Sequence, residues 1–146
     1  MVMTKKILWF DDDPAQVKPY LETLNEEGYF AEVVSNITEA ESLLNNSRYD
    51  LFILDVMIPT KNSGEENRFS PEKTERGRKL GLYFFLKYKE KLQGNNTQTL
   101  VLTQRLDLNI RDEFIKAGLQ PDHFCTKFAL RDVEIFLLKI KYLLGE

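Results

Sequence analysis

Short apolar runs alternate with longer amphipathic stretches along the whole chain. The short runs predict β-strands at 7–10, 29–34, 51–54, 99–102 and 123–126. Apolar residues at helical spacing predict helices at 14–25, 38–44, 77–92, 108–117 and 130–144, the first beginning at Pro14. This strict alternation predicts an α/β fold in which helices cover both faces of a parallel sheet.

The third and fourth predicted strands are continuously apolar at 51–54 and 100–102. Strands of this kind are buried on both faces, which favours a doubly wound sheet over an open antiparallel one. The length of 146 residues fits one domain, so we expect residues 1–146 to form a single domain. Pro19 lies inside the first predicted helix and is expected to kink or delay it.

One connection is much longer than the others. The segment from Thr60 to Arg76 (TKNSGEENRFSPEKTER) is polar and rich in turn residues. Connections in α/β units usually need only about 2–6 residues. We therefore interpret 60–76 as an insertion, either functional or a solvated loop without a role.

Composition excludes several classes of function. A net charge of −3 offers no general attraction for nucleic acid, so no direct DNA or RNA binding is expected. The single Cys125 permits no intramolecular disulfide, and the single His123 leaves too little for a histidine-based metal centre or a catalytic triad. Only four apolar residues separate Lys6 from Asp11, so we expect neither a signal peptide nor a membrane span, and a cytoplasmic location.

Polar side chains that can carry chemistry follow four of the predicted strands. Asp11 and Asp12 follow the first strand, Asp55 the third, Thr103 the fourth and Lys127 the fifth. The carboxyl ends of parallel strands meet at one edge, where the ligand crevice lies at the point of reversed strand order. The second strand contributes nothing comparable, which fits the order 2-1-3-4-5.

These five residues are the groups that phosphoryl transfer to a carboxylate requires. Three carboxylates repel one another unless a cation lies among them, and Mg²⁺ prefers oxygen ligands. A carboxylate can attack phosphorus, while an ammonium and a hydroxyl hold phosphoryl oxygens. Taken singly, an acidic run before Pro14 is often a favourable helix start, and Lys127 is an ordinary surface lysine. Their joint placement at one edge favours the chemical interpretation.

At this point the chain resembles the response regulator receiver family. The segments that carry the resemblance are KKILWFDDDP, DLFILDVMIP, TLVLT and HFCTKF. The similarity extends over nearly the whole chain except 60–76. It implies a flavodoxin-like three-layer sandwich, with Asp55 as phosphoacceptor and metal ligand. It also implies that Asp12 binds Mg²⁺ directly, Asp11 largely through water, and Met57 through its backbone carbonyl.

The resemblance implies that Thr103 and Lys127 contact the phosphoryl group and that Phe124 is the switch aromatic. Packing in the core explains Phe124 equally well. Two residues depart from the family pattern. Phe128 follows Lys127 where the family usually has a proline after a cis peptide bond, and a non-proline cis bond costs about 3–4 kcal/mol. Gln104 replaces a small residue, where it would slow access of the donor or shield the acyl phosphate from water.

The last predicted helix carries two apolar stripes. One consists of Val133, Phe136, Leu137, Ile140 and Leu144 and is expected to face the sheet, and the other of Ile135, Leu138 and Tyr142. A second apolar face needs something to cover it. We expect this helix to meet a partner or to form a homodimer.

The sequence therefore predicts a phosphoacceptor switch of a two-component phosphorelay, without an attached output domain. Its partners would be a sensor histidine kinase or phosphotransfer protein and a downstream target protein, and its only catalysis would act on itself. One alternative is a degenerate receiver-like binding module that is not phosphorylated. Another is a phosphohydrolase that uses Asp11 and Asp13 as a D-x-D motif, which Ala15 and the lack of an acidic pair after the fourth strand disfavour.

Overall fold

The computed structural model describes residues 4–58 and 79–146, so the predicted insertion at 60–76 lies outside the described residues. The strands are β1 (Lys6–Phe10), β2 (Phe30–Val34), β3 (Leu51–Leu54), β4 (Gln98–Thr103) and β5 (Phe124–Thr126). The helices are α1 (Pro14–Glu26), α2 (Ile37–Asn46), α3 (Leu80–Gly94), α4 (Leu108–Lys116) and α5 (Val133–Leu143), with a short 3₁₀ turn at Pro121–His123. None of the helices in the described ranges is long and apolar enough to cross a membrane.

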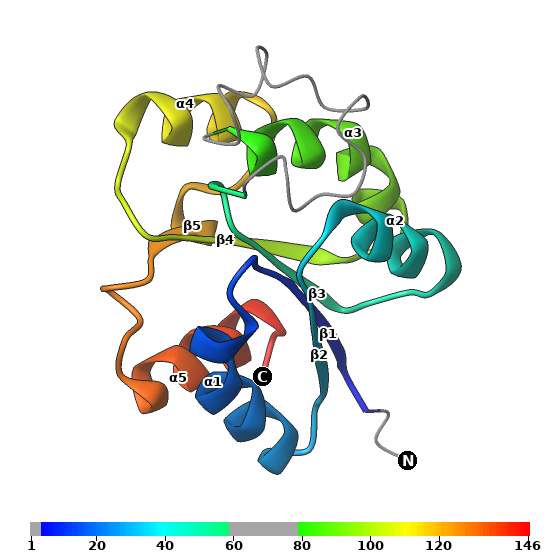
Figure 1. Ribbon diagram of the computed structural model, residues 1–146, viewed down its shortest axis with the longest axis vertical. Coiled ribbons are helices and arrows are strands. Elements are labelled where there is room, and N and C mark those ends of the chain that lie inside the picture. Colours follow the sequence, from blue (N-terminus) through cyan, green and yellow to red (C-terminus); the bar gives the residue numbers. More distant parts are fainter. Residues whose placement is uncertain (1–3, 59–78) are drawn as a thin grey trace.

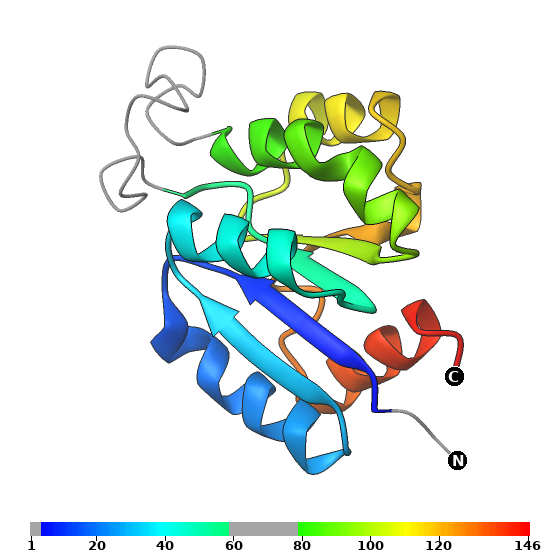
Figure 2. The ribbon, with the colours of Figure 1, turned by 90° about the vertical axis from the view of Figure 1, so that its right-hand side faces the viewer.

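The five strands form one parallel sheet in the order β2-β1-β3-β4-β5. Helices α1 and α5 cover one face, and α2, α3 and α4 cover the other (Figure 1). The three layers are separated in the view turned by 90° (Figure 2). The predicted flavodoxin-like α/β sandwich and its strand order are confirmed.

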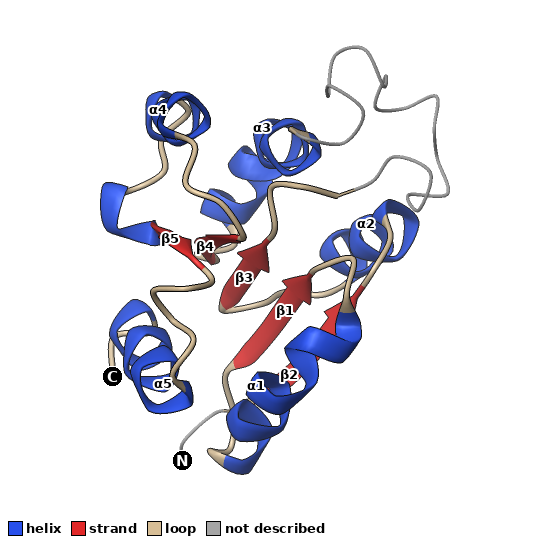
Figure 3. Ribbon diagram, turned by 60° about the vertical axis from the view of Figure 1, so that its left-hand side comes forward, coloured by secondary structure: helices blue, strands red, loops and turns tan. Residues whose placement is uncertain are grey.

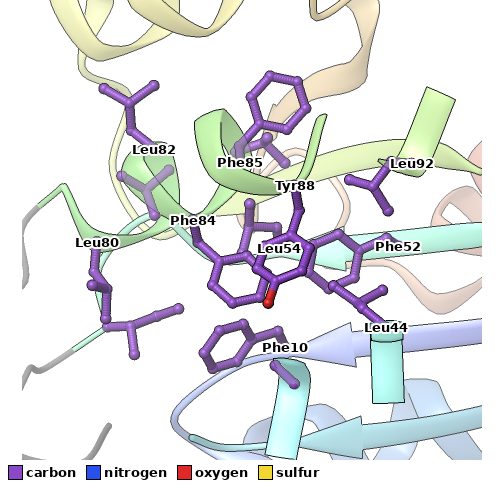
Figure 4. Packing of buried hydrophobic residues seen from close by; sticks show 14 of the residues in the cluster. Phe10, Leu44, Phe52, Leu54, Leu80, Leu82, Phe84, Phe85, Tyr88 and Leu92 are labelled. Atoms are coloured by element: carbon purple, nitrogen blue, oxygen red, sulfur yellow. The ribbon is translucent and has the colours of Figure 1, made fainter. Parts of the chain in front are cut away.

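A separate apolar cluster lies on each face of the sheet. Because successive side chains of a strand point to opposite faces, β1 places Leu8 and Phe10 in one cluster and Ile7 and Trp9 in the other. The ring of Phe84 from α3 meets that of Phe10 edge to face, with 5.2 Å between centroids (Figure 4). This two-sided burial explains the continuous apolar runs.

Capping residues set the helix boundaries where the sequence pattern left them open. Helix α5 begins at Val133 rather than 130, because the Asp132 carboxylate accepts hydrogen bonds from the backbone N–H groups of Glu134 and Ile135. Asn36 caps α2 in the same way, through the N–H of Glu39. Helix α1 continues through Pro19 to Glu26, so the expected delay of its start is wrong.

Candidate functional site

The fold brings Asp11, Asp12 and Asp55 together as predicted. Each offers a carboxylate oxygen, and these atoms lie within 4.8 Å of one another. The cause is the sheet register: Phe10 on β1 is level with Leu54 on β3, so the residues that follow leave the sheet side by side. Figure 3 shows the arrowheads of β1 and β3 ending at this edge. Asp11 and Asp55 are buried, whereas Asp12 is half-buried.

Lys127 reaches this cluster from β5. Its Nζ donates hydrogen bonds to Asp11 Oδ2 at 2.8 Å and to Asp55 Oδ2 at 3.3 Å. Its backbone N–H donates to the carbonyl of Thr103 at 2.7 Å, which holds the start of the β5–α5 connection against the end of β4. The described residues contain no cis peptide bond, so the bond between Lys127 and Phe128 is trans. The lysine thus reaches both carboxylates without the cis turn.

Burial and mutual repulsion shape the protonation of the cluster. Burial raises the pKa of Asp55 to about 7, with a further rise from the charge of Asp11 and an opposing effect of Lys127. Burial, followed by the charge of Asp11, also raises the pKa of Asp12. Burial by itself lowers the pKa of Lys127, but the neighbouring carboxylates, Asp55 first, outweigh it and raise that pKa above its usual value. These raised pKa values mean that three negative charges at this edge are unfavourable. A hard divalent cation, which prefers oxygen ligands, would compensate those charges.

A cavity of about 180 Å³ lies between the loop after β3, the β4–α4 connection and β5, with Met57, Thr103 and Phe124 in its wall. The Met57 backbone N–H donates to Asp55 Oδ1 at 3.3 Å, which ties the loop after β3 to the carboxylate. Thr103 and Phe124 are buried, and the Phe124 ring packs against Phe114 with 5.7 Å between centroids. Phe124 therefore belongs to the core and also borders free space. The structure is compatible with Phe124 as a core residue and with Phe124 as the switch aromatic.

The residues that depart from the family pattern lie at the surface. Phe128 is 69% exposed, and Gln104 is exposed at the rim of a second cavity that Asp11 and Lys127 also border. Asp13 is not part of the acidic cluster. Its side chain caps α1 by accepting a hydrogen bond from the backbone N–H of Gln16 at 3.3 Å.

Gly81 is a site residue that sequence reasoning missed. It lies in the first turn of α3, and its backbone N–H donates to the carbonyl of Val56 at 2.9 Å. Its Cα faces the backbone carbonyl of Asp55 so closely that no side chain fits. The available signal was a glycine inside the apolar run at 80–86 of the predicted helix, where glycine costs helix stability and therefore calls for a packing reason.

Neither a protein-family model nor a curated protein matches this chain. Solved structures do match it in fold. A CheY-like response regulator receiver domain protein from Methanospirillum hungatei superimposes with a TM-score of 0.75 at 22% identity, covering 98% of this chain and 95% of its own. The beryllofluoride-activated NtrC4 receiver domain dimer gives a TM-score of 0.71 at 24% identity, covering 97% of this chain and 98% of its own.

A third neighbour is a response regulator protein from Burkholderia pseudomallei with a phosphorylated aspartic acid, a calcium ion and citrate. It gives a TM-score of 0.69 at 19% identity and covers 97% of this chain and 69% of its own. The fold of this chain is therefore that of the response regulator receiver domains, and the likeness in fold extends over nearly its whole length.

Proposed function

We propose that the chain is a phosphorylation switch of a two-component system that accepts a phosphoryl group on Asp55. The observation that carries this proposal is the position of Lys127. Its ammonium joins Asp11 and Asp55 at the carboxyl edge of the sheet, beside a cluster of three carboxylates. A cation placed on the oxygens of a nucleophile and a metal ligand is the arrangement that phosphoryl transfer needs.

Mg²⁺ is the proposed cofactor of this site. The carboxylates of Asp11, Asp12 and Asp55 and the backbone carbonyl of Met57 would hold it, with Asp12 binding directly and Asp11 largely through water. Oxygen-only ligands fit this ion. The neighbour from Burkholderia pseudomallei is described with a phosphorylated aspartic acid and a calcium ion. When bound, Mg²⁺ neutralises charge that develops on the phosphoryl oxygens.

The other roles in phosphoryl transfer would belong to side chains of the protein. An ionised Asp55 oxygen attacks the phosphorus as the bond from phosphorus to the donor breaks, so Asp55 must first lose the proton that burial favours. The Lys127 ammonium holds one phosphoryl oxygen and the Thr103 hydroxyl holds another. Movement of Thr103 toward the phosphoryl group would let Phe124 change rotamer, and the cavity that both border supplies the space.

The proposal extends to the partners and the setting of the switch. The phosphoryl donor would be a sensor histidine kinase or phosphotransfer protein, and output would pass through contacts with a downstream target protein in the cytoplasm. Residues 1–146 would act as one receiver domain that catalyses only its own phosphorylation and dephosphorylation. The exposed stripe on α5 would support a homodimer, the state named for the NtrC4 neighbour.

Intact mass after incubation with acetyl phosphate and Mg²⁺ tests the proposal. We expect the wild-type protein to gain one phosphoryl group and the Asp55→Asn variant to gain none. Asp112→Asn, which alters an exposed carboxylate on α4, is the matched control and should be phosphorylated normally. An unmodified wild type would favour the degenerate binding module, and an adduct on Asp55→Asn would place the acceptor elsewhere. Turnover of p-nitrophenyl phosphate would instead favour a phosphohydrolase.

A further inference from the structure

Residues 127–132 connect β5 to α5, and the first of them is Lys127, which presents its ammonium to the acidic cluster. The peptide bond between Lys127 and Phe128 is trans. The side chain of Phe128 is 69% exposed, so it does not anchor the connection in the core. The position of the lysine therefore depends on the other contacts that hold this connection in place.

Contacts between neighbours in the sequence determine the shape of the β5–α5 connection. The backbone N–H of Ala129 donates to Thr126 Oγ1 at 3.1 Å. The Nη1 of Arg131 donates to the Phe128 carbonyl at 3.0 Å, and its guanidinium lies 3.9 Å from the centroid of the Phe128 ring. Leu130 is buried in the apolar cluster that includes residues of α1 and α5, so its side chain anchors the middle of the connection.

Helix α1 holds the end of the connection through Tyr20. The Tyr20 hydroxyl donates a hydrogen bond to the backbone carbonyl of Arg131 at 2.7 Å, across 111 positions of the sequence. The half-buried ring of Tyr20 packs edge to face against Phe136, with 5.1 Å between centroids, and its centroid lies 6.3 Å from that of Trp9. Because this packing already fixes the ring, the hydrogen bond restrains the connection at little further cost in conformational entropy.

We propose that Tyr20 is a positioning residue for phosphoryl transfer, which fixes the β5–α5 connection so that Lys127 reaches the acceptor site. The inference rests on the proposed phosphorylation of Asp55. The Tyr20 hydroxyl is bonded to the Arg131 carbonyl, so it acts through the connection rather than on the phosphoryl group. Phosphoryl transfer depends on a cation held at the phosphoryl oxygens, and a displacement of about 1 Å can slow an enzymatic reaction on the order of a hundredfold.

Tyr20→Phe removes the hydroxyl and keeps the packed ring. We expect phosphorylation by acetyl phosphate at saturating Mg²⁺, followed by intact mass, to be about three- to tenfold slower, the effect of one hydrogen bond. Amide hydrogen exchange across 127–131 should become faster, and this measurement requires no phosphorylation. Thr23→Val is the matched control on α1, because it removes a hydroxyl that donates to the Pro19 carbonyl within the helix. It should leave both the rate and the exchange unchanged.

A double-mutant cycle with Lys127→Gln distinguishes positioning from a general loss of stability. If Tyr20 acts through Lys127, adding Tyr20→Phe to Lys127→Gln should slow phosphorylation no further, whereas independent effects would multiply. Multiplying effects would overturn the proposal, as would a wild-type rate or unchanged exchange in Tyr20→Phe. In those cases the wild type is still phosphorylated on Asp55, and only the positioning role fails. A wild type that gains no phosphoryl group would refute the proposed function, and the role of Tyr20 with it.

Discussion

The Cα of Gly81, in the first turn of α3, lies directly against the backbone carbonyl of Asp55 at the end of β3. A Cβ on Gly81 would lie 2.1 Å from that oxygen and 2.7 Å from the Cα of Val56. Both obstacles are backbone atoms, so neither can turn away as a side chain would. The absence of a side chain at this one helix position therefore lets α3 approach the strand that carries the proposed phosphoacceptor.

Gly81→Ala should consequently destabilise the protein and disturb the site. We expect a loss of about 1–3 kcal/mol in the free energy of unfolding, as for other insertions into tightly packed positions, together with slower phosphorylation of Asp55. Urea unfolding and intact mass after acetyl phosphate treatment measure the two effects.

Gly94→Ala is the control for Gly81→Ala. A methyl group added at Gly94 would meet no atom of another described element within 4 Å, and alanine favours helices. This variant should therefore be neutral or slightly stabilised. Equal behaviour of both variants would contradict the packing argument.

Lys127→Gln should separate phosphoryl transfer from metal binding. The ammonium hydrogen-bonds to the same carboxylates, Asp11 and Asp55, that are proposed to hold Mg²⁺. Removing it takes away a competing cation and a partner for the phosphoryl oxygens. We expect Mg²⁺ affinity, measured by calorimetry, to be retained or increased, while the rate of phosphorylation falls at least about tenfold.

Asp12→Asn provides the comparison for Lys127→Gln, because it removes a proposed metal ligand and leaves the lysine in place. Its Mg²⁺ affinity should fall. A Lys127→Gln variant that lost Mg²⁺ affinity to the same extent would show that the lysine organises the carboxylates rather than competing for them.

Stability without Mg²⁺ should depend on pH through Asp55. Burial raises the pKa of this carboxyl from 3.8 to about 7, so between these values the folded protein binds more protons than the unfolded chain. The free energy of unfolding therefore falls as pH rises through this window. Asp55→Asn removes the titrating group and should be more stable than the wild type above the folded-state pKa, by on the order of 2–4 kcal/mol.

The stability difference between Asp55→Asn and the wild type should shrink as pH is lowered toward 4. Urea unfolding in EDTA across this range measures it. Asp112→Asn, on the exposed side of α4, should show no such trend. A difference between Asp55→Asn and the wild type that does not vary with pH would rule out the raised pKa as its cause.

The exposed stripe of α5 should mediate self-association. Ile135, Leu138 and Tyr142 are 52%, 67% and 63% exposed and lie on the face of the helix that the sheet does not cover. We expect dimers in sedimentation velocity after treatment with beryllofluoride and Mg²⁺, and monomers for Leu138→Glu. Leu86→Glu, an exposed leucine on α3, should still dimerise. A monomeric wild type under these conditions would argue against the homodimer.

The periodicity of apolar residues was sufficient to predict the sheet, its helices and the edge that carries the site. Strand and helix signals are local, and the carboxyl ends of parallel strands meet wherever the chain alternates in this way. Asp11, Asp12 and Asp55 could therefore be grouped from their positions alone, and their proximity is confirmed. Helix starts were less certain, because caps such as Asp132 depend on single side chains rather than on a pattern.

Only the tertiary structure decided how distant side chains meet. Lys127 and Asp11 are 116 positions apart in the sequence, yet their side chains form a hydrogen bond. The peptide bond before Phe128 is trans, and the path of the β5–α5 connection nevertheless brings the ammonium to the carboxylates. The close approach of Gly81 to β3 and the hydrogen bond from Tyr20 to Arg131 are likewise properties of packing. A sequence pattern states which face a residue prefers, whereas the space and the hydrogen-bond partners that it finds there depend on all the elements packed around it.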